Sequence, residues 1–236
     1  MTAHLKSRNS SWKLGKTQYS NITFSNPVGC VYENDEGLFL LFRGKKTKIK
    51  KTSCMKLIDK YLKKGFYACG YMSFEFTEKK INKSNYKAIF NLYERSEIAT
   101  RSARCKNINN ESTLQKIQAD KIFLQGVTKA KKYIQNGDIY QINLTREFSF
   151  KPPPNPHDLF LKYYNEQPVD YGSYIKFDDH SVISGSMELF LEKTGNTVRT
   201  KPIKGTSKID SQSKKQIQHD EKELACLLYT SPSPRD

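Results

Sequence analysis

Three stretches of β-type residues lie between positions 171 and 203, and only short polar turns separate them. They read YGSYIKF (171–177), SVISGSMELFLEK (181–193) and TVRTKPI (197–203). Turns this short join neighbouring strands only when the strands run antiparallel, because parallel pairs need a long crossover connection. The sequence therefore predicts an antiparallel meander here.

The first hundred residues show the same character. Residues from about 17 to 108 contain further β-type segments and a hairpin signal at 34–37. One helix is expected near 54–64, where Met55, Ile58 and Leu62 recur at helical spacing. A polar run at 106–113 is typical of a boundary. These patterns predict an α+β fold dominated by antiparallel sheet.

A second helix is expected after this boundary. An apolar stripe repeats at intervals of four, three and four residues, and it consists of Phe123, Val127, Ala130 and Ile134. Asn136 and Gly137 are typical of a helix C-terminus. A short third helix is expected near 157–164, after the proline-rich KPPPNP.

Residues 138–150, DIYQINLTREFSF, alternate between apolar and polar side chains, which predicts a strand. Its apolar face would pack on the second helix. The opposite face would present Gln141, Asn143 and Thr145 in a row. An ordinary half-solvated strand would show the same pattern, so the alternation by itself leaves the role of these side chains open.

Lys204 stands in an unusual frame, TKPIKGT (200–206). Pro202 fixes the backbone where the last strand ends, and Gly205 frees the turn that follows. This frame directs Lys204 to the end of the sheet, whereas most lysines are merely solvated. Glu188 is expected on the neighbouring strand. The pair could form a salt bridge or an acid–nucleophile couple, and spacing leaves both open.

Charge and cysteine usage limit the function classes. The net charge of +16 raises the alternative of a basic nucleic-acid-binding module. However, the basic residues are scattered and only 8 of 40 are arginine, so we expect no nucleic-acid partner. Five cysteines without metal-type spacing fit a reduced, cytoplasmic compartment. No apolar run approaches the roughly 20 residues that cross a bilayer, so no membrane partner is expected.

Three motifs together, NGDIYQINLTREF, SGSMELF and TKPIKGT, resemble those of the chorismate-utilising enzymes in order and separation. Upstream, CGYMSFEF is similar to the family's N-terminal part. Among these enzymes the chain is most similar to component I of aminodeoxychorismate synthase. The resemblance implies an antiparallel β-sandwich with flanking helices of the anthranilate synthase component I type, with only the first half present. Residues 1–110 would form the N-terminal β-rich region, and 111–225 would begin the chorismate-binding catalytic domain.

The resemblance also implies roles for individual residues. Lys204 would be the nucleophile and Glu188 the general acid, since anthranilate synthases usually carry alanine where Lys204 stands. Isochorismate and salicylate synthases place a water-activating lysine where this chain has Gln141. The implied substrate-binding residues are Gln141, Asn143, Gly205 and Thr206. Anthranilate synthase component I remains the alternative within the family.

Two places depart from the family pattern. The acid usually stands in Ser-Pro-Glu-Arg-Phe, and this chain has Met187 and Leu189 on either side of Glu188. The glutamate and the phenylalanine are kept, whereas the proline and the arginine are missing. Members that hold tryptophan use a Pro-aromatic segment, where this chain reads DYG (170–172). No tryptophan site is expected.

The last residues, CLLYTSPSPRD (226–236), do not resemble the family. They look like one reading frame of a transposon-type sequencing adaptor, so we expect a non-native tail. Cys226 stands where the family has a magnesium-binding glutamate, so Mg²⁺ is expected in the full-length parent and not in this chain. The parent would use ammonia from a glutamine amidotransferase subunit on the route to 4-aminobenzoate and folate. The 236-residue chain by itself is expected to be inactive and prone to aggregate.

Overall fold

The computed structural model describes residues 2–77, 86–100, 114–117, 120–151, 155–203, 219–221 and 224. The chain divides into two compact units. Unit 1 comprises residues 1–106 and 160–187, and unit 2 comprises 107–159 and 188–236. The first division falls beside the expected boundary at 106–113. The functional division into a region before and a region after residue 110 stays a prediction.

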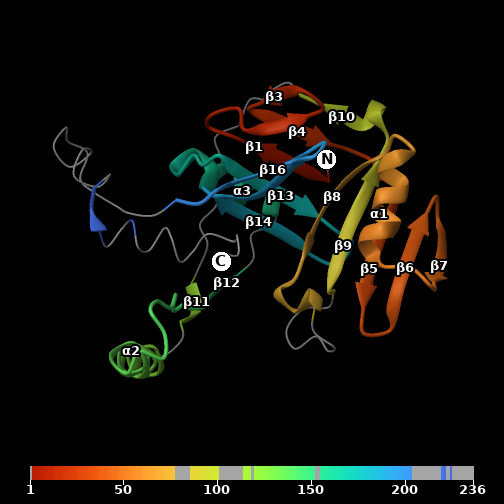
Figure 1. Ribbon diagram of the computed structural model, residues 1–236. Helices are drawn as coiled ribbons and strands as arrows, with labels where there is room; N and C mark the ends of the chain where they lie inside the picture. The colour runs from red at the N-terminus through yellow and green to blue at the C-terminus, as the bar shows by residue number, and fades with distance from the viewer. Residues whose placement is uncertain are drawn as a thin grey trace. The chain divides into compact units, whose positions relative to one another are not determined.

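Unit 1 contains two five-stranded antiparallel sheets (Figure 1). The first sheet has the order β10-β4-β1-β13-β14. Its strands are β10 (Ile98–Ala99), β4 (Asn21–Phe24), β1 (Ala3–Lys6), β13 (Tyr171–Lys176) and β14 (Ser181–Ser186). The second sheet has the order β7-β6-β5-β9-β8. Its strands are β7 (Lys45–Ile49), β6 (Gly37–Phe42), β5 (Gly29–Asn34), β9 (Ala88–Tyr93) and β8 (Tyr67–Met72).

The two sheets of unit 1 share one apolar core, which makes them a sandwich. Ala3 and Leu5 of β1 lie in the same buried cluster as Ile89 and Tyr93 of β9. His4, which alternates with them, points to the other face and contacts the ring of Phe160. The expected hairpin at 34–37 is confirmed, since Asn34 pairs with Gly37 where β5 meets β6. The antiparallel prediction is confirmed for this unit.

One helix covers each outer face of the sandwich. α1 (Cys54–Lys63) begins at the N-cap Ser53 and packs on the second sheet through Cys54, Leu57 and Ile58. The expected helix is confirmed, and of its expected apolar stripe Ile58 is buried. Met55 and Leu62 are exposed instead, because the face that meets the sheet carries Cys54 and Leu57 beside Ile58.

The third helix is confirmed as α3 (Pro156–Glu166). Phe160, which is fully buried, contacts His4 and stacks on Tyr174 of the first sheet. A small hairpin of β2 (Trp12–Leu14) and β3 (Thr17–Tyr19) completes unit 1 with two 3₁₀ turns, Phe74–Thr77 and Arg95–Glu97. Trp12 packs against the core of unit 1, and it is the chain's single tryptophan. Its fluorescence therefore reports on unit 1.

Unit 2 contains α2 (Asp120–Gln135) and two antiparallel sheets of two strands each. β11 (Leu114–Ile117) pairs with β12 (Phe148–Phe150), and β15 (Leu189–Thr194) pairs with β16 (Thr197–Lys201). The expected helix on the Phe123 stripe is confirmed as α2. In the described part of the chain, no helix has the length and apolar character that a membrane span requires.

Two expected strands differ in the structure. Of residues 138–150, only Phe148–Phe150 forms a strand, and Gln141 and Asn143 lie in irregular backbone. The expected single strand over 181–193 breaks at Met187 and Glu188, which separates β14 from β15. A strand needs a partner for its backbone hydrogen bonds as well as alternation. β13 supplies this partner as far as Ser186, and β16 supplies it from Leu189 onward.

Three cysteines of unit 1 predict how its stability depends on pH. Burial raises the pKa of the thiols of Cys30, Cys54 and Cys69 from 9.0 to about 12, and at Cys30 the nearby Asp178 adds to the effect. Above pH 9 the unfolded chain therefore loses thiol protons that the folded chain keeps. The free energy of unfolding should be highest below pH 9 and should fall as the pH rises towards 12.

Urea unfolding followed by Trp12 fluorescence between about pH 8 and 11 measures this decline. Replacing the buried Cys69 by alanine should make the slope shallower by up to ~1.4 kcal/mol per pH unit. An identical slope in the Cys69→Ala variant would contradict the assignment.

Candidate functional site

Glu188 lies where the chain passes from β14 to β15. The hairpin that follows brings the far end of β16 back beside it, because Leu189 pairs with Lys201. The Thr200 hydroxyl donates a hydrogen bond to the carbonyl oxygen of Leu189 at 3.1 Å. One step further, the backbone N–H of Ile203 donates to Oε1 of Glu188 at 3.0 Å. The carboxylate of Glu188 is therefore bonded to the residue directly before Lys204.

This contact changes the expected geometry. We expected Glu188 within a continuous strand, but the structure places it at a strand break, with an exposed side chain. A strand break frees the side chain from the alternation of the sheet, and the Ile203 N–H then fixes one of its oxygens. Spacing predicted that Glu188 and the end of β16 would be neighbours. The backbone hydrogen bond could not be predicted from spacing.

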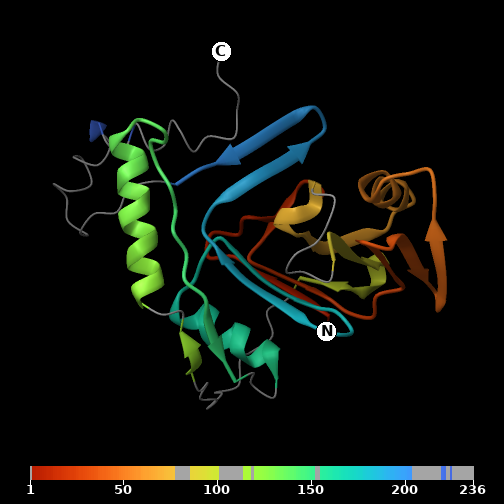
Figure 2. The same cartoon turned by 90° about the horizontal axis from the view of Figure 1, so that it is seen from below.

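Gln141 and Asn143 are both exposed, in the segment that runs beside α2 (Figure 2). Leu144 faces the helix, since a Cβ added to Gly126 of α2 would meet its Cδ1 at 3.9 Å. The guanidinium of Arg146 lies 5.4 Å from the ring centroid of Phe123. Leu144 thus follows the expectation that the apolar side packs on the helix. Tyr140, expected on the same side, is largely exposed.

Lys204, Gly205 and Thr206 lie outside the described residues, as do Cys226 and the rest of 226–236. Their predicted roles stay predictions. Within the described residues, no group of three or more His, Cys, Asp or Glu side chains is placed to hold a metal ion.

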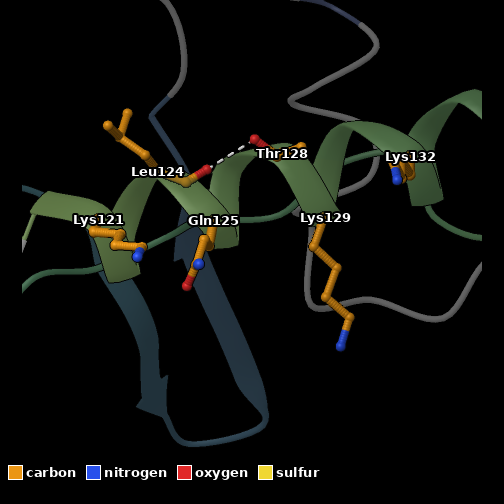
Figure 3. A pocket seen from close by; sticks show the side chains of 6 residues that line it. All are labelled: Lys121, Leu124, Gln125, Thr128, Lys129 and Lys132. Carbon is orange, nitrogen blue, oxygen red and sulfur yellow. Dashed lines mark hydrogen bonds between the residues drawn. The ribbon is translucent and has the colours of Figure 1, made fainter.

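Sequence reasoning missed a basic hollow on α2 (Figure 3). Its volume is about 640 Å³, and its described lining comes entirely from α2. The lining residues are Lys121, Leu124, Gln125, Thr128, Lys129 and Lys132. In Figure 3 the side chains of Lys121, Gln125 and Lys129 point to the same side of the helix. The sequence signal that could have predicted this hollow is the spacing of its three lysines, at intervals of eight and three residues. Their positive charges attract anions to this surface.

Unit 2 exposes many large apolar side chains for its size. They include Ile122, Leu124, Tyr133, Ile134, Tyr140, Ile142, Phe148, Phe150, Phe190, Leu191 and Val198. In unit 1 the comparable side chains are mostly buried between the sheets and under α1 and α3. Exposed apolar groups on this scale mark surfaces that other residues cover in a stable fold.

Comparisons with known proteins agree with the fold and with the order of motifs. The family model described as chorismate binding enzyme matches residues 71–229. The aminodeoxychorismate synthase component 1 of Bacillus subtilis is 33% identical over 109 residues, which cover 44% of this chain and 23% of that protein. The anthranilate synthase component 1 of Acetivibrio thermocellus is also 33% identical over 109 residues, covering 44% of this chain and 22% of that protein.

Among solved structures, anthranilate synthase component I from Streptococcus pneumoniae superimposes with a TM-score of 0.68 at 20% identity. The match covers 92% of this chain and 60% of that chain. The expected fold, α+β with antiparallel sheets and flanking helices of this type, is thereby confirmed. The matched segments span less than a quarter of the length of the two sequence relatives named above.

Proposed function

We propose that this chain, which belongs to the chorismate binding enzyme family, is part of an aminodeoxychorismate synthase that converts chorismate and ammonia to 4-amino-4-deoxychorismate. The observation that supports the proposal is the hydrogen bond from Ile203 to Glu188, which holds a carboxyl group at the backbone of the residue that precedes Lys204 in the sequence. An amine nucleophile and a proton donor are the two groups that this substitution requires.

The reaction would begin with the Lys204 amine. It bonds to the ring carbon between the one that carries the carboxylate and the one that carries the ether oxygen. The ring double bonds shift, and the bond to the 4-hydroxyl oxygen breaks. Ammonia then bonds to the carbon that lost this oxygen, the double bonds shift back, and the lysine amine leaves. One difficult substitution thus becomes two easier ones.

Glu188 would supply the proton that lets the 4-hydroxyl leave as water. In the second step it would take back the surplus proton of the added ammonia. A general acid of this kind contributes roughly 10²–10⁴-fold. The Ile203 N–H holds one carboxyl oxygen at 3.0 Å and so orients the group. The exposure of Glu188 in this chain implies that further residues of the whole protein exclude water from the site.

Gln141 and Lys204 distinguish the proposed activity from others of the family. Isochorismate and salicylate synthases carry a water-activating lysine at the position of Gln141, and an amide cannot activate water in that way. Anthranilate synthases usually have alanine at position 204. Anthranilate synthesis remains the second candidate, because an anthranilate synthase and an aminodeoxychorismate synthase match this chain at the same identity.

The whole protein would also need Mg²⁺ and a source of ammonia. No group of three or more potential ligands lies within the described residues, and no step above uses the ion. Ammonia would come from a glutamine amidotransferase subunit, as component I enzymes of this family imply. Chorismate carries two carboxylates, and the proposed contacts to it are Gln141, Asn143, Gly205 and Thr206.

Product identification tests the proposal. The whole synthase, supplied with chorismate, Mg²⁺ and an ammonium salt, should form a non-fluorescent product that an added aminodeoxychorismate lyase converts to 4-aminobenzoate. A fluorescent product formed without the lyase would identify anthranilate and contradict the proposal. The 236-residue chain assayed in parallel should form neither product.

A further inference from the structure

A second cavity lies in unit 1, apart from every residue of the candidate site. Its volume is about 570 Å³, within the range of small-molecule pockets. Its described lining comes from β5, β6 and β9, from Thr2, Pro27 and Tyr86, and from residues 176–179 at the end of β13 and in the turn that follows it. Aromatic rings and carboxylates characterise this lining, and the residues concerned are Tyr32, Tyr86, Phe177, Asp178 and Asp179. We name it the tyrosine–aspartate cavity.

The aromatic wall is held in place by His180. The His180 ring stacks on Phe177, with centroids 4.9 Å apart, and on Tyr86, with centroids 5.8 Å apart. On the other side, its Nε2 forms a hydrogen bond with the hydroxyl of Tyr71 at 3.0 Å. Phe177 is itself buried. Rings fixed in this way present faces of negative potential, which attract cations.

The carboxylate of Asp179 is oriented as well. Nδ1 of His180 lies 2.6 Å from Oδ1 of Asp179, and the Tyr86 hydroxyl donates a hydrogen bond to Oδ2 at 3.3 Å. Both Asp178 and Asp179 also act on Cys30 at the cavity lining, since each contributes to the raised pKa of its thiol after burial. Lys176 is the one basic residue in the described lining, against these two carboxylates.

We propose that the tyrosine–aspartate cavity binds a small organic cation: a primary ammonium group on an aromatic or apolar body. The carboxylates of Asp178 and Asp179 take the ammonium group, and the rings of Tyr32, Tyr86 and Phe177 take its body. An anion of the same shape meets two carboxylates and is rejected. This site lies within unit 1, so the proposal stands or falls independently of chorismate amination.

Ligand-observed NMR titrations of the 236-residue chain with 2-phenylethylamine test the proposal. We expect saturable binding, and we expect 3-phenylpropionate, which replaces the ammonium by a carboxylate, not to bind. Putrescine, a diamine without a ring, distinguishes two classes of natural ligand, polyamines and aromatic amines. Tighter binding of putrescine would support the cation site and identify a polyamine, whereas weaker binding would identify an aromatic amine.

Charge-removing variants locate the binding. Asp178→Asn and Asp179→Asn should each weaken 2-phenylethylamine binding by about tenfold or more. Asp59→Asn, on α1 and paired with Lys63, removes the same charge elsewhere and should leave the affinity unchanged. Because Asp178 is exposed, Asp178→Asn should not disturb folding. Trp12 fluorescence verifies that both variants are folded. Equal affinity for 3-phenylpropionate, unchanged affinity in both cavity variants, or no saturable binding would overturn the proposal.

Discussion

Replacing Lys204 by alanine should lower ammonia-dependent turnover of chorismate in the whole synthase by at least ~10³-fold. The alanine side chain cannot form the covalent intermediate, so the substitution would have to proceed in one difficult step. Steady-state formation of 4-aminobenzoate in the lyase-coupled assay measures the loss. A Lys204→Ala enzyme that keeps full turnover would remove the lysine from the mechanism, whatever the product.

Glu188→Gln tests the proposed general acid in the same assay. Glutamine can still accept the hydrogen bond from Ile203 N–H, so the local backbone is kept, but its amide cannot deliver an acid proton. The expected loss is roughly 10²–10⁴-fold. Glu192→Gln, on the same hairpin, is the control and should remain active. If the two groups act together, the double variant should lose much less than the product of the two single losses.

Those parts of the fold that depend on local sequence patterns could be predicted from the sequence. Short turns predicted antiparallel pairing, and all three expected helices are present as α1, α2 and α3. Periodicity was less informative about which face is buried. At α1 it favoured Met55, Ile58 and Leu62, yet of these only Ile58 is buried, together with Cys54 and Leu57. Which face of the helix is buried depends on how it packs against the second sheet, whose strands come from distant parts of the chain.

Strand extent also depends on partners that a local pattern does not reveal. Residues 138–147 alternate like a strand, but in the structure they follow α2 as irregular backbone, with Leu144 on the helix. The break at Glu188 has the same cause, because β14 and β15 pair in different sheets. Likewise, the tyrosine–aspartate cavity joins residues that lie about 150 positions apart, from Tyr32 to Asp179. Sequence spacing does not predict contacts between residues this far apart in the chain.

Gly70→Ala should be the most destabilising single-methyl substitution in unit 1. Gly70 lies opposite Phe90 in the pairing of β8 with β9 and belongs to the CGYMSFEF motif. A Cβ at this position would clash with the carbonyl oxygen of Ile89 and would lie 2.6 Å from Cα of Phe90. These are backbone atoms of β9, which is also hydrogen-bonded to β5, so β9 cannot yield without loss of pairing on its other side.

We expect Gly70→Ala to lower the free energy of unfolding of unit 1 by about 3 kcal/mol or more. Urea unfolding followed by Trp12 fluorescence measures the change. Gly126→Ala is the matched control: its Cβ would meet Leu144 at 3.9 Å, an ordinary contact, and alanine favours α2 by ~0.5–1 kcal/mol. Because Gly126 belongs to unit 2, this control should leave the Trp12 transition in place. If Gly70→Ala leaves it equally unmoved, β8 and β9 do not approach each other as closely as the structure places them.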